Sequence, residues 1–240
     1  RMALMCKGGS RSNLFYNNYV HSRERTIQNA FGIGGLSNNT SIWGGTKDFW
    51  EAFNVYVFNN VVVADNPGKV TYGISFMGAR DSGAFNNIFV GCDYGVQYRV
   101  PDDMSYGWEW NPTNLNIIFK NNVVMDSVEG ACIYVDGDPI NLDSDYNLYY
   151  NNAGTDPVEP NSIYNQDPRF VASKSDWNLM ADSPLKGAGT PISGLVGLSG
   201  EGFFAGFDKN YILRGDTWDI GVYDVDGTQS YDPGGIIFNE

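Results

Sequence analysis

Pairs of consecutive asparagines recur along the chain, and this repeat constrains the fold more than any other feature of the sequence. The pairs begin at Asn17, Asn38, Asn59, Asn86, Asn121 and Asn151. Most of them follow a bulky or long residue and precede two residues that favour β-strands. The intervals between pairs range from 21 to 35 residues. Such unequal spacing is typical of coils that share one core and carry loops of different lengths.

A second repeat supplies short apolar strands. It occurs as Phe31-Gly32-Ile33, Tyr72-Gly73-Ile74, Tyr94-Gly95-Val96 and, more loosely, Gly130-Ala131-Cys132-Ile133. Each copy is expected to begin a strand. A strand that recurs once in roughly 20 to 40 residues cannot bury a face alone and must stack on its neighbours. The sequence therefore predicts an all-β solenoid with little helix.

Together the two repeats resemble the right-handed parallel β-helix proteins of the pectate lyase type, which are mostly secreted polysaccharide lyases and glycoside hydrolases. In that family asparagine side chains form ladders inside the turns. Stacked amides can bond to one another, and asparagine tolerates the left-handed backbone region. The resemblance implies a right-handed parallel β-helix, a polysaccharide or oligosaccharide as partner, and a secreted location, either extracellular or periplasmic.

The character of the chain changes near residue 143. Residues 1–142 are expected to form the coils, and residues 143–240 a closing coil and a C-terminal cap of the same domain. Five tail segments resemble, in order, the C-terminal tail of many secreted bacterial β-helix proteins: Asp145–Tyr150, Asp167–Val171, Asp176–Leu179, Ser183–Gly189 and Asp219–Tyr223. A cap is needed over the open end because an uncovered last coil presents unpaired strand edges. The alternative is a separate small domain from about residue 190.

The first residues already resemble a strand, Met2–Cys6, with no cap before it. We therefore expect further coils, together with any targeting signal, to precede Arg1 in the native protein. Full activity is expected to depend on those coils.

The charge balance limits the range of partners. The formal net charge is −13 at pH 7 and the isoelectric point is near 4.3, so nucleic acid, which needs a basic surface, is not expected as a partner. A polyanionic sugar would need a local cluster of lysines and arginines, or bound calcium, to reverse the sign of the field in a groove. No apolar run is long enough to cross a bilayer, and a monomer is expected.

The cysteines and the single histidine do not indicate a metal site. Cys6, Cys92 and Cys132 lack metal-ligand spacing, and an odd number cannot all pair within one chain, so buried free thiols are expected. His21 lies in a charged segment without a second histidine or a cysteine nearby, so it is expected to be exposed.

Strand alternation predicts where a ligand groove lies. If Ile33, Ile74, Val96 and Ala131 point into the core, the side chains three positions later point outward. That outward column contains Lys7, Leu36, Met77, Arg99 and Tyr134, with Gln97 one step back and Asp136 further on. Loops at about 38–52 and 101–113 border this face, and their Trp43, Trp50, Trp108 and Trp110 can stack on sugar rings.

The glycine-rich run Cys6–Phe15, which contains Lys7, resembles a segment of the family 9 polysaccharide lyases. That family uses a lysine base and calcium bound by aspartates, so the resemblance implies a catalytic Lys7 and calcium, without an organic cofactor. The sequence departs from the family pattern at Met2 and at Ala30–Ile33, where the family has aspartates.

A lyase needs a base to remove the proton next to a uronate carboxylate and a cation to hold the resulting enediolate. The residue types suited to these roles are Lys7, Arg80, Arg99, and Tyr98 or Tyr134. Coils stack about 4.8 Å apart, so Lys7 and Arg99, three coils apart, would be roughly 14 Å from each other. They would line successive sugar subsites and not act on one bond.

Two alternatives to a lyase stay open. Hydrolysis needs two carboxylates about 5–5.5 Å apart for retention or about 6.5–9.5 Å apart for inversion. The sequence offers Asp136 with Asp138, Asp102 with Asp103, and Asp81. A non-catalytic glycan-binding or adhesion solenoid needs no such pair. We expect a polysaccharide lyase, with a glycoside hydrolase second.

Overall fold

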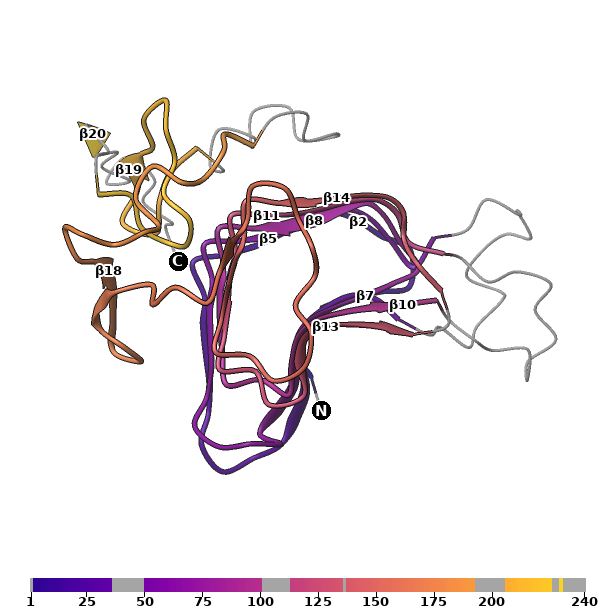
Figure 1. Cartoon of the computed structure of the whole chain (residues 1–240). Helices are drawn as coiled ribbons and strands as arrows, with labels where there is room; N and C mark the ends of the chain where they lie inside the picture. The colour runs from indigo at the N-terminus through magenta and orange to yellow at the C-terminus, as the bar shows by residue number, and fades with distance from the viewer. Residues whose placement is uncertain are drawn as a thin grey trace, which may run out of the picture.

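The computed structural model describes residues 2–35, 50–100, 113–135, 137–192, 206–225 and 229–230. This part of the chain consists of strands, turns and irregular segments and contains no helix. Strands that are far apart in the sequence lie side by side in layered sheets (Figure 1). The predicted all-β class is confirmed.

Most strands belong to three parallel sheets. Sheet A contains β1 (Met2–Cys6), β4 (Ile27–Gly34), β7 (Val70–Met77), β10 (Tyr94–Arg99) and β13 (Gly130–Val135). Sheet B contains β2 (Ser10–Tyr16), β5 (Ala52–Phe58), β8 (Ala79–Phe85), β11 (Leu115–Lys120) and β14 (Ile140–Asp145). Sheet C contains β3 (Tyr19–Ser22), β6 (Val61–Ala64), β9 (Ile88–Val90), β12 (Val123–Met125), β15 (Leu148–Tyr150) and β16 (Ile163–Tyr164).

The chain visits sheets A, B and C in turn, and from β1 to β15 it repeats this circuit with each new strand beside the equivalent strand of the previous circuit. This order is compatible with a β-solenoid. The core lies between the sheets, where Phe31, Val57 and Phe89 have no exposed surface. Rings at equivalent positions stack across coils, with Phe76 and Tyr98 centroids 5.6 Å apart.

The asparagine pairs form the turn between sheets B and C. The first residue of a pair has a left-handed backbone, with φ of 57° at Asn17, 54° at Asn59 and 55° at both Asn86 and Asn121. The second residues form a ladder of Nδ2 to Oδ1 hydrogen bonds, 2.9, 3.0, 3.0 and 3.2 Å long, through Asn18, Asn60, Asn87, Asn122 and Asn147. The predicted amide ladder is confirmed.

The last step of the ladder differs from the prediction. Tyr146, with φ of 56°, and Asn147 take the place of the pair, whereas Asn151 and Asn152 lie in the turn after β15. The ladder ends at the buried Glu159, whose carboxylate accepts from Asn147 Nδ2 at 3.0 Å and from the Tyr149 hydroxyl at 2.9 Å. The amide row therefore finishes on an acceptor and not on an unpaired group.

The tail packs against the outward face of sheet C. Its strands form two antiparallel pairs, β17 (Phe170–Ala172) with β18 (Asp176–Leu179) and β19 (Ile212–Leu213) with β20 (Gln229–Ser230). One apolar cluster joins the tail to outward residues of sheet C: Trp177, Leu185 and Ile220 with Val61, Ile88 and Val123. The sequence predicts a closing coil and a cap over the end of the solenoid. Strands β14 to β16 continue the coils, and from Phe170 on the described part of the tail covers the side of the solenoid, where these apolar side chains need burial.

Two strand assignments made from the sequence are wrong. The sequence predicts single strands over residues 13–20 and 53–64, but the asparagine pair divides each into two strands of different sheets. The polar run from Arg80 to Gly83, expected as a bend, lies within β8. The chain bends instead at Gly78, with φ of 64°, while Asp81 has φ of 46° inside the strand.

Candidate functional site

The strand register defines the outward face of sheet A. Arg99 pairs with Met77 on one side and with Val135 on the other. Gly34 pairs with Met77, and Cys6 pairs with Ile33, so Lys7 follows at the level of Gly34. The outward column therefore contains Lys7, Gly34, Met77 and Arg99, and the backbone of Val135 pairs beside Arg99.

This column agrees with the prediction at Lys7, Met77 and Arg99 and differs at two positions. Gly34 takes the level assigned to Leu36, which lies outside the described residues. Val135 pairs with Arg99, whereas Tyr134 pairs with Tyr98, whose ring lies in the core. The predicted alignment is off by one residue at Ala131, because Cys132 pairs with Val96, and by two residues at Ile33, because Phe31 pairs with Ile74.

Lys7 is exposed and lies between β1 and β2. The buried Glu51 holds the glycine turn that follows it. The Gly8 N–H donates to Glu51 Oε2 at 2.9 Å, and the Gly9 N–H donates to the Glu51 carbonyl at 3.0 Å. Sequence reasoning missed Glu51. Its only signal is a charged residue directly before the apolar strand β5.

The polar side chains of sheet A differ in their exposure. Gln97 is only 4% exposed, and its Oε1 accepts a hydrogen bond from the Ser75 hydroxyl at 2.7 Å. Arg99 is half-buried, and its carbonyl accepts from Asn114 Nδ2 at 3.1 Å. Among the described polar side chains of the outward column and of the adjacent column that contains Ser75 and Gln97, Lys7 and Arg99 have solvent-exposed surface that a ligand can reach. The Gln97 side chain is buried and hydrogen-bonded to Ser75 on the adjacent strand.

Arg80 and Trp50 lie together, but on sheet B. The register places Arg11, Phe53 and Arg80 side by side on β2, β5 and β8. The Arg80 guanidinium carbon lies 5.5 Å from the ring centre of Phe53 and 5.6 Å from that of Trp50, and the Arg11 carbon lies 5.9 Å from the Phe53 ring centre. Only Gly78 separates β7 from β8, so this cluster lies one corner away from Met77.

The other predicted site residues are not placed. Trp43, Trp108, Trp110 and Asp136 lie outside the described residues, and of Tyr134 only the backbone pairing is described. The structure thus places Arg80 beside Trp50 at sheet B, and it puts Lys7, Gln97 and Arg99 on sheet A with Lys7 three strand spacings from Arg99.

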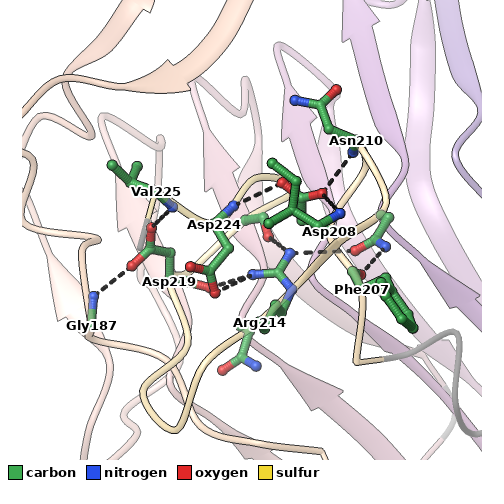
Figure 2. A network of polar contacts seen from close by, with 12 residues as sticks. Gly187, Phe207, Asp208, Asn210, Arg214, Asp219, Asp224 and Val225 are labelled. Carbon is green, nitrogen blue, oxygen red and sulfur yellow. Dashed lines mark hydrogen bonds and ion pairs between the residues drawn. The ribbon is translucent and has the colours of Figure 1, made fainter. Parts of the chain in front are cut away.

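The tail contains an enclosed charged cluster around Arg214 (Figure 2). The side chains of Arg214 and Asp224 have no exposed surface, and Nη1 lies 3.9 Å from Oδ2. Arg214 donates to the carbonyls of Asp219 at 3.2 Å and Gly221 at 2.8 Å. Burial lowers the pKa of Arg214 and raises that of Asp208. Because these groups are enclosed, we assign them to anchoring the tail and not to ligand binding.

The left-handed asparagines also fasten the tail to the coils. Asn59 Nδ2 donates to the Phe207 carbonyl at 2.7 Å, and Asn121 Nδ2 donates to the Thr190 carbonyl at 2.8 Å. Lys209 Nζ lies 3.4 Å from the carbonyls of Asn18 and Asn59, and burial lowers the pKa of Lys209 to about 8. The same repeat therefore builds the core ladder and provides docking groups for the tail.

Calcium has no matching ligand set in the part of the chain that the structure describes. There, no three His, Cys, Asp or Glu side chains are grouped so that they could hold a metal ion. The carboxylate beside the Lys7 turn is that of Glu51, which is bonded to the Gly8 N–H. The donor set that the family 9 resemblance implies is thus not met by these residues, and no step proposed below uses calcium.

The cysteines are free thiols, of which Cys6 and Cys92 are buried and Cys132 is half-buried. His21, expected to be exposed, is half-buried, and its Nε2 lies 2.8 Å from Asp65 Oδ1. The hydrogen bond from His21 lowers the pKa of Asp65. This pair belongs to sheet C and the turn after β6, away from the Lys7 and Arg80 groups.

No family model, curated protein or solved structure matches this chain. In the described part of the chain, no helix is both long and apolar enough to cross a membrane.

Proposed function

We propose that this protein is a secreted, carbohydrate-active parallel β-helix of the right-handed type that cleaves a uronate-containing polysaccharide by β-elimination. One observation carries the proposal. In a chain with a net charge of −13, Lys7 and Arg99 lie in one outward column, with Arg80 one corner away. Local positive charge on an acidic protein supports an anionic ligand at that place.

The proposed reaction assigns separate roles to these residues. Lys7 acts as the base and takes the proton from the sugar carbon next to the carboxylate, the electron pair of that bond forms a carbon–carbon double bond, and the glycosidic oxygen leaves the neighbouring carbon with its bonding pair and takes a proton from water. The reaction also requires a cation beside the enediolate that develops on the carboxylate. Arg99 lies three strand spacings from Lys7, about 14 Å, so it holds the carboxylate of another sugar in the chain.

The experiment is a screen of uronate polysaccharides for the ultraviolet absorbance of the unsaturated product. Lys7→Ala is expected to abolish product formation while folding is retained. Arg99→Ala is expected to lower turnover or binding about tenfold, about 1.4 kcal/mol. Arg25→Ala, which removes an exposed arginine from the turn before β4, is the matched control. Full activity of Lys7→Ala would exclude this lysine as the base.

A non-catalytic glycan-binding solenoid is the second candidate. It is favoured by the separation of Lys7 from Arg99, because a base and a cation that far apart do not act on one bond. Sugar binding without bond cleavage would support this candidate. New reducing ends without the unsaturated product would instead indicate a glycoside hydrolase.

A further inference from the structure

We propose that sheet B carries a second carbohydrate contact, a subsite for a sugar carboxylate formed by Arg11, Phe53, Arg80 and Trp50. The inference rests on the proposed function in taking a uronate-containing glycan as the ligand. It extends the ligand from the outward face of sheet A around the corner at Gly78. In this assignment Arg80 binds the glycan and takes no part in bond cleavage.

The two arginines lie on either side of one aromatic ring. Phe53 is half-buried and stands between Arg11 and Arg80 in the register. Neighbouring strands are about 4.8 Å apart, so the two arginine positions are about 10 Å apart. A ring face attracts a guanidinium and holds its plane in place. Because Asp81 pairs with Arg80, the two arginines and this carboxylate carry one net positive charge on a small surface, and a bound sugar carboxylate would offset it.

Arg80 is oriented by a row of polar contacts that crosses three strands. Its Nε donates to Asp81 Oδ2 at 3.1 Å, and Asp81 Oδ1 accepts from Asn116 Nδ2 at 2.5 Å. Asn116 Oδ1 in turn accepts from Asn141 Nδ2 at 3.0 Å. These contacts fix the Nε edge of the Arg80 guanidinium.

The outer part of the cluster remains accessible. The Arg80 side chain is 40% exposed, whereas that of Asp81 is 13% exposed. An arginine held by one edge can bind a carboxylate with its terminal nitrogens, and this planar two-point contact distinguishes carboxylates from neutral sugar hydroxyls. Trp50 and Phe53 provide apolar ring surface next to that contact.

The test is calorimetric titration of the full chain with galacturonate, alginate and glucuronate oligosaccharides and with their carboxyl-reduced counterparts. Arg80→Gln is expected to weaken binding of the acidic oligosaccharide about tenfold, and Arg11→Gln about threefold. Arg80→Lys keeps the charge but loses the planar fork, so it should also weaken binding several-fold. Arg25→Gln removes the same charge at another place on the surface, and its affinity for the acidic oligosaccharide should stay within about twofold of that of the unaltered protein.

The subsite is overturned if Arg80→Gln binds as tightly as Arg25→Gln, if the carboxyl-reduced sugars bind as tightly as the acidic ones, or if the unaltered protein binds none of the oligosaccharides. Lower thermal stability of Arg80→Gln with unchanged affinity would also overturn the subsite, because the cluster would then only stabilise the fold at the Gly78 corner. Product formation is measured on the same samples. If unsaturated product forms and the affinity of Arg80→Gln is unchanged, the subsite is excluded and the lyase reaction stands. If the affinity of Arg80→Gln is weakened and no product forms, the subsite stands and the lyase reaction is excluded.

Discussion

A buried asparagine stabilises a fold only when its amide groups are bonded, and in this protein each ladder asparagine is the partner of the next. Asn87 Nδ2 donates to the Val57 carbonyl at 2.9 Å and to Asn122 Oδ1 at 3.0 Å, and its Oδ1 accepts from Asn60. Removing one amide therefore leaves unpaired groups on the coils at both sides. The ladder acts as a row of coupled contacts and not as independent turns.

Replacing Asn87 by alanine is expected to lower the free energy of unfolding by about 3 kcal/mol or more, because several buried donors and acceptors lose their partners. Urea denaturation measures the change. The control is Asn178→Ala, an exposed amide in the tail, which should change stability by less than about 1 kcal/mol. Equal effects of the two substitutions would show that the ladder contributes no special stability.

At the scale of single elements, the tail is attached through charge burial as well as through its apolar cluster. Arg214→Met leaves the carboxylates of Asp208 and Asp224 buried without their cation, and this should lower the free energy of unfolding by about 3–5 kcal/mol. Arg169→Met breaks an ion pair with Asp182 that is about half exposed, and this should change the free energy of unfolding by less than about 1 kcal/mol. Urea denaturation of both variants tests this. An Arg214 variant as stable as the Arg169 variant would contradict the anchoring role.

The tail also makes stability depend on pH. Burial lowers the pKa of Lys209 from 10.5 to about 8, so below pH 8 the lysine is charged in both states and its burial opposes folding. Between about pH 8 and 10.5 Lys209 binds more protons in the unfolded chain than in the folded protein. The contribution of Lys209 to the free energy of unfolding therefore rises with pH in this range. Denaturation across this range should show that rise in the unaltered protein and a smaller one in Lys209→Met. Identical slopes would mean that Lys209 has an ordinary pKa.

The sequence predicts the elements with an obvious residue signature and misses those without one. The asparagine pairs locate the left-handed turns, but Asp81 takes the same backbone region inside β8, so its polar neighbours resembled a bend. The predicted register is off by one residue at Gly130–Cys132, a copy without the aromatic residue, and by two residues at Phe31–Ile33, because Asn29 and not Phe31 pairs with Tyr72. The site on sheet B was not predicted as a unit, because Arg11, Phe53 and Arg80 meet only through the pairing of three coils.

At the scale of the whole molecule, the described part of the tail covers sheet C and part of sheet B, where Ile192 packs against Tyr56, Phe58 and Phe85. It covers the outward valines and isoleucines of sheet C, which occur in strands apolar on both faces. The run Val61–Val63 already carried that signal, since a continuous apolar strand indicates burial on both sides. Sheets A and B carry the arginines and the lysine of the proposed site, and they meet at the Gly78 corner.

The most direct test of this account is a crystal structure of the protein with a bound uronate oligosaccharide. Sugar rings are expected over the outward face of sheet A, with one carboxylate at Arg99 and the glycan continuing toward Arg80 on sheet B. Sugar bound along the tail or the side of sheet C, with Arg99 and Arg80 free of ligand, would contradict it.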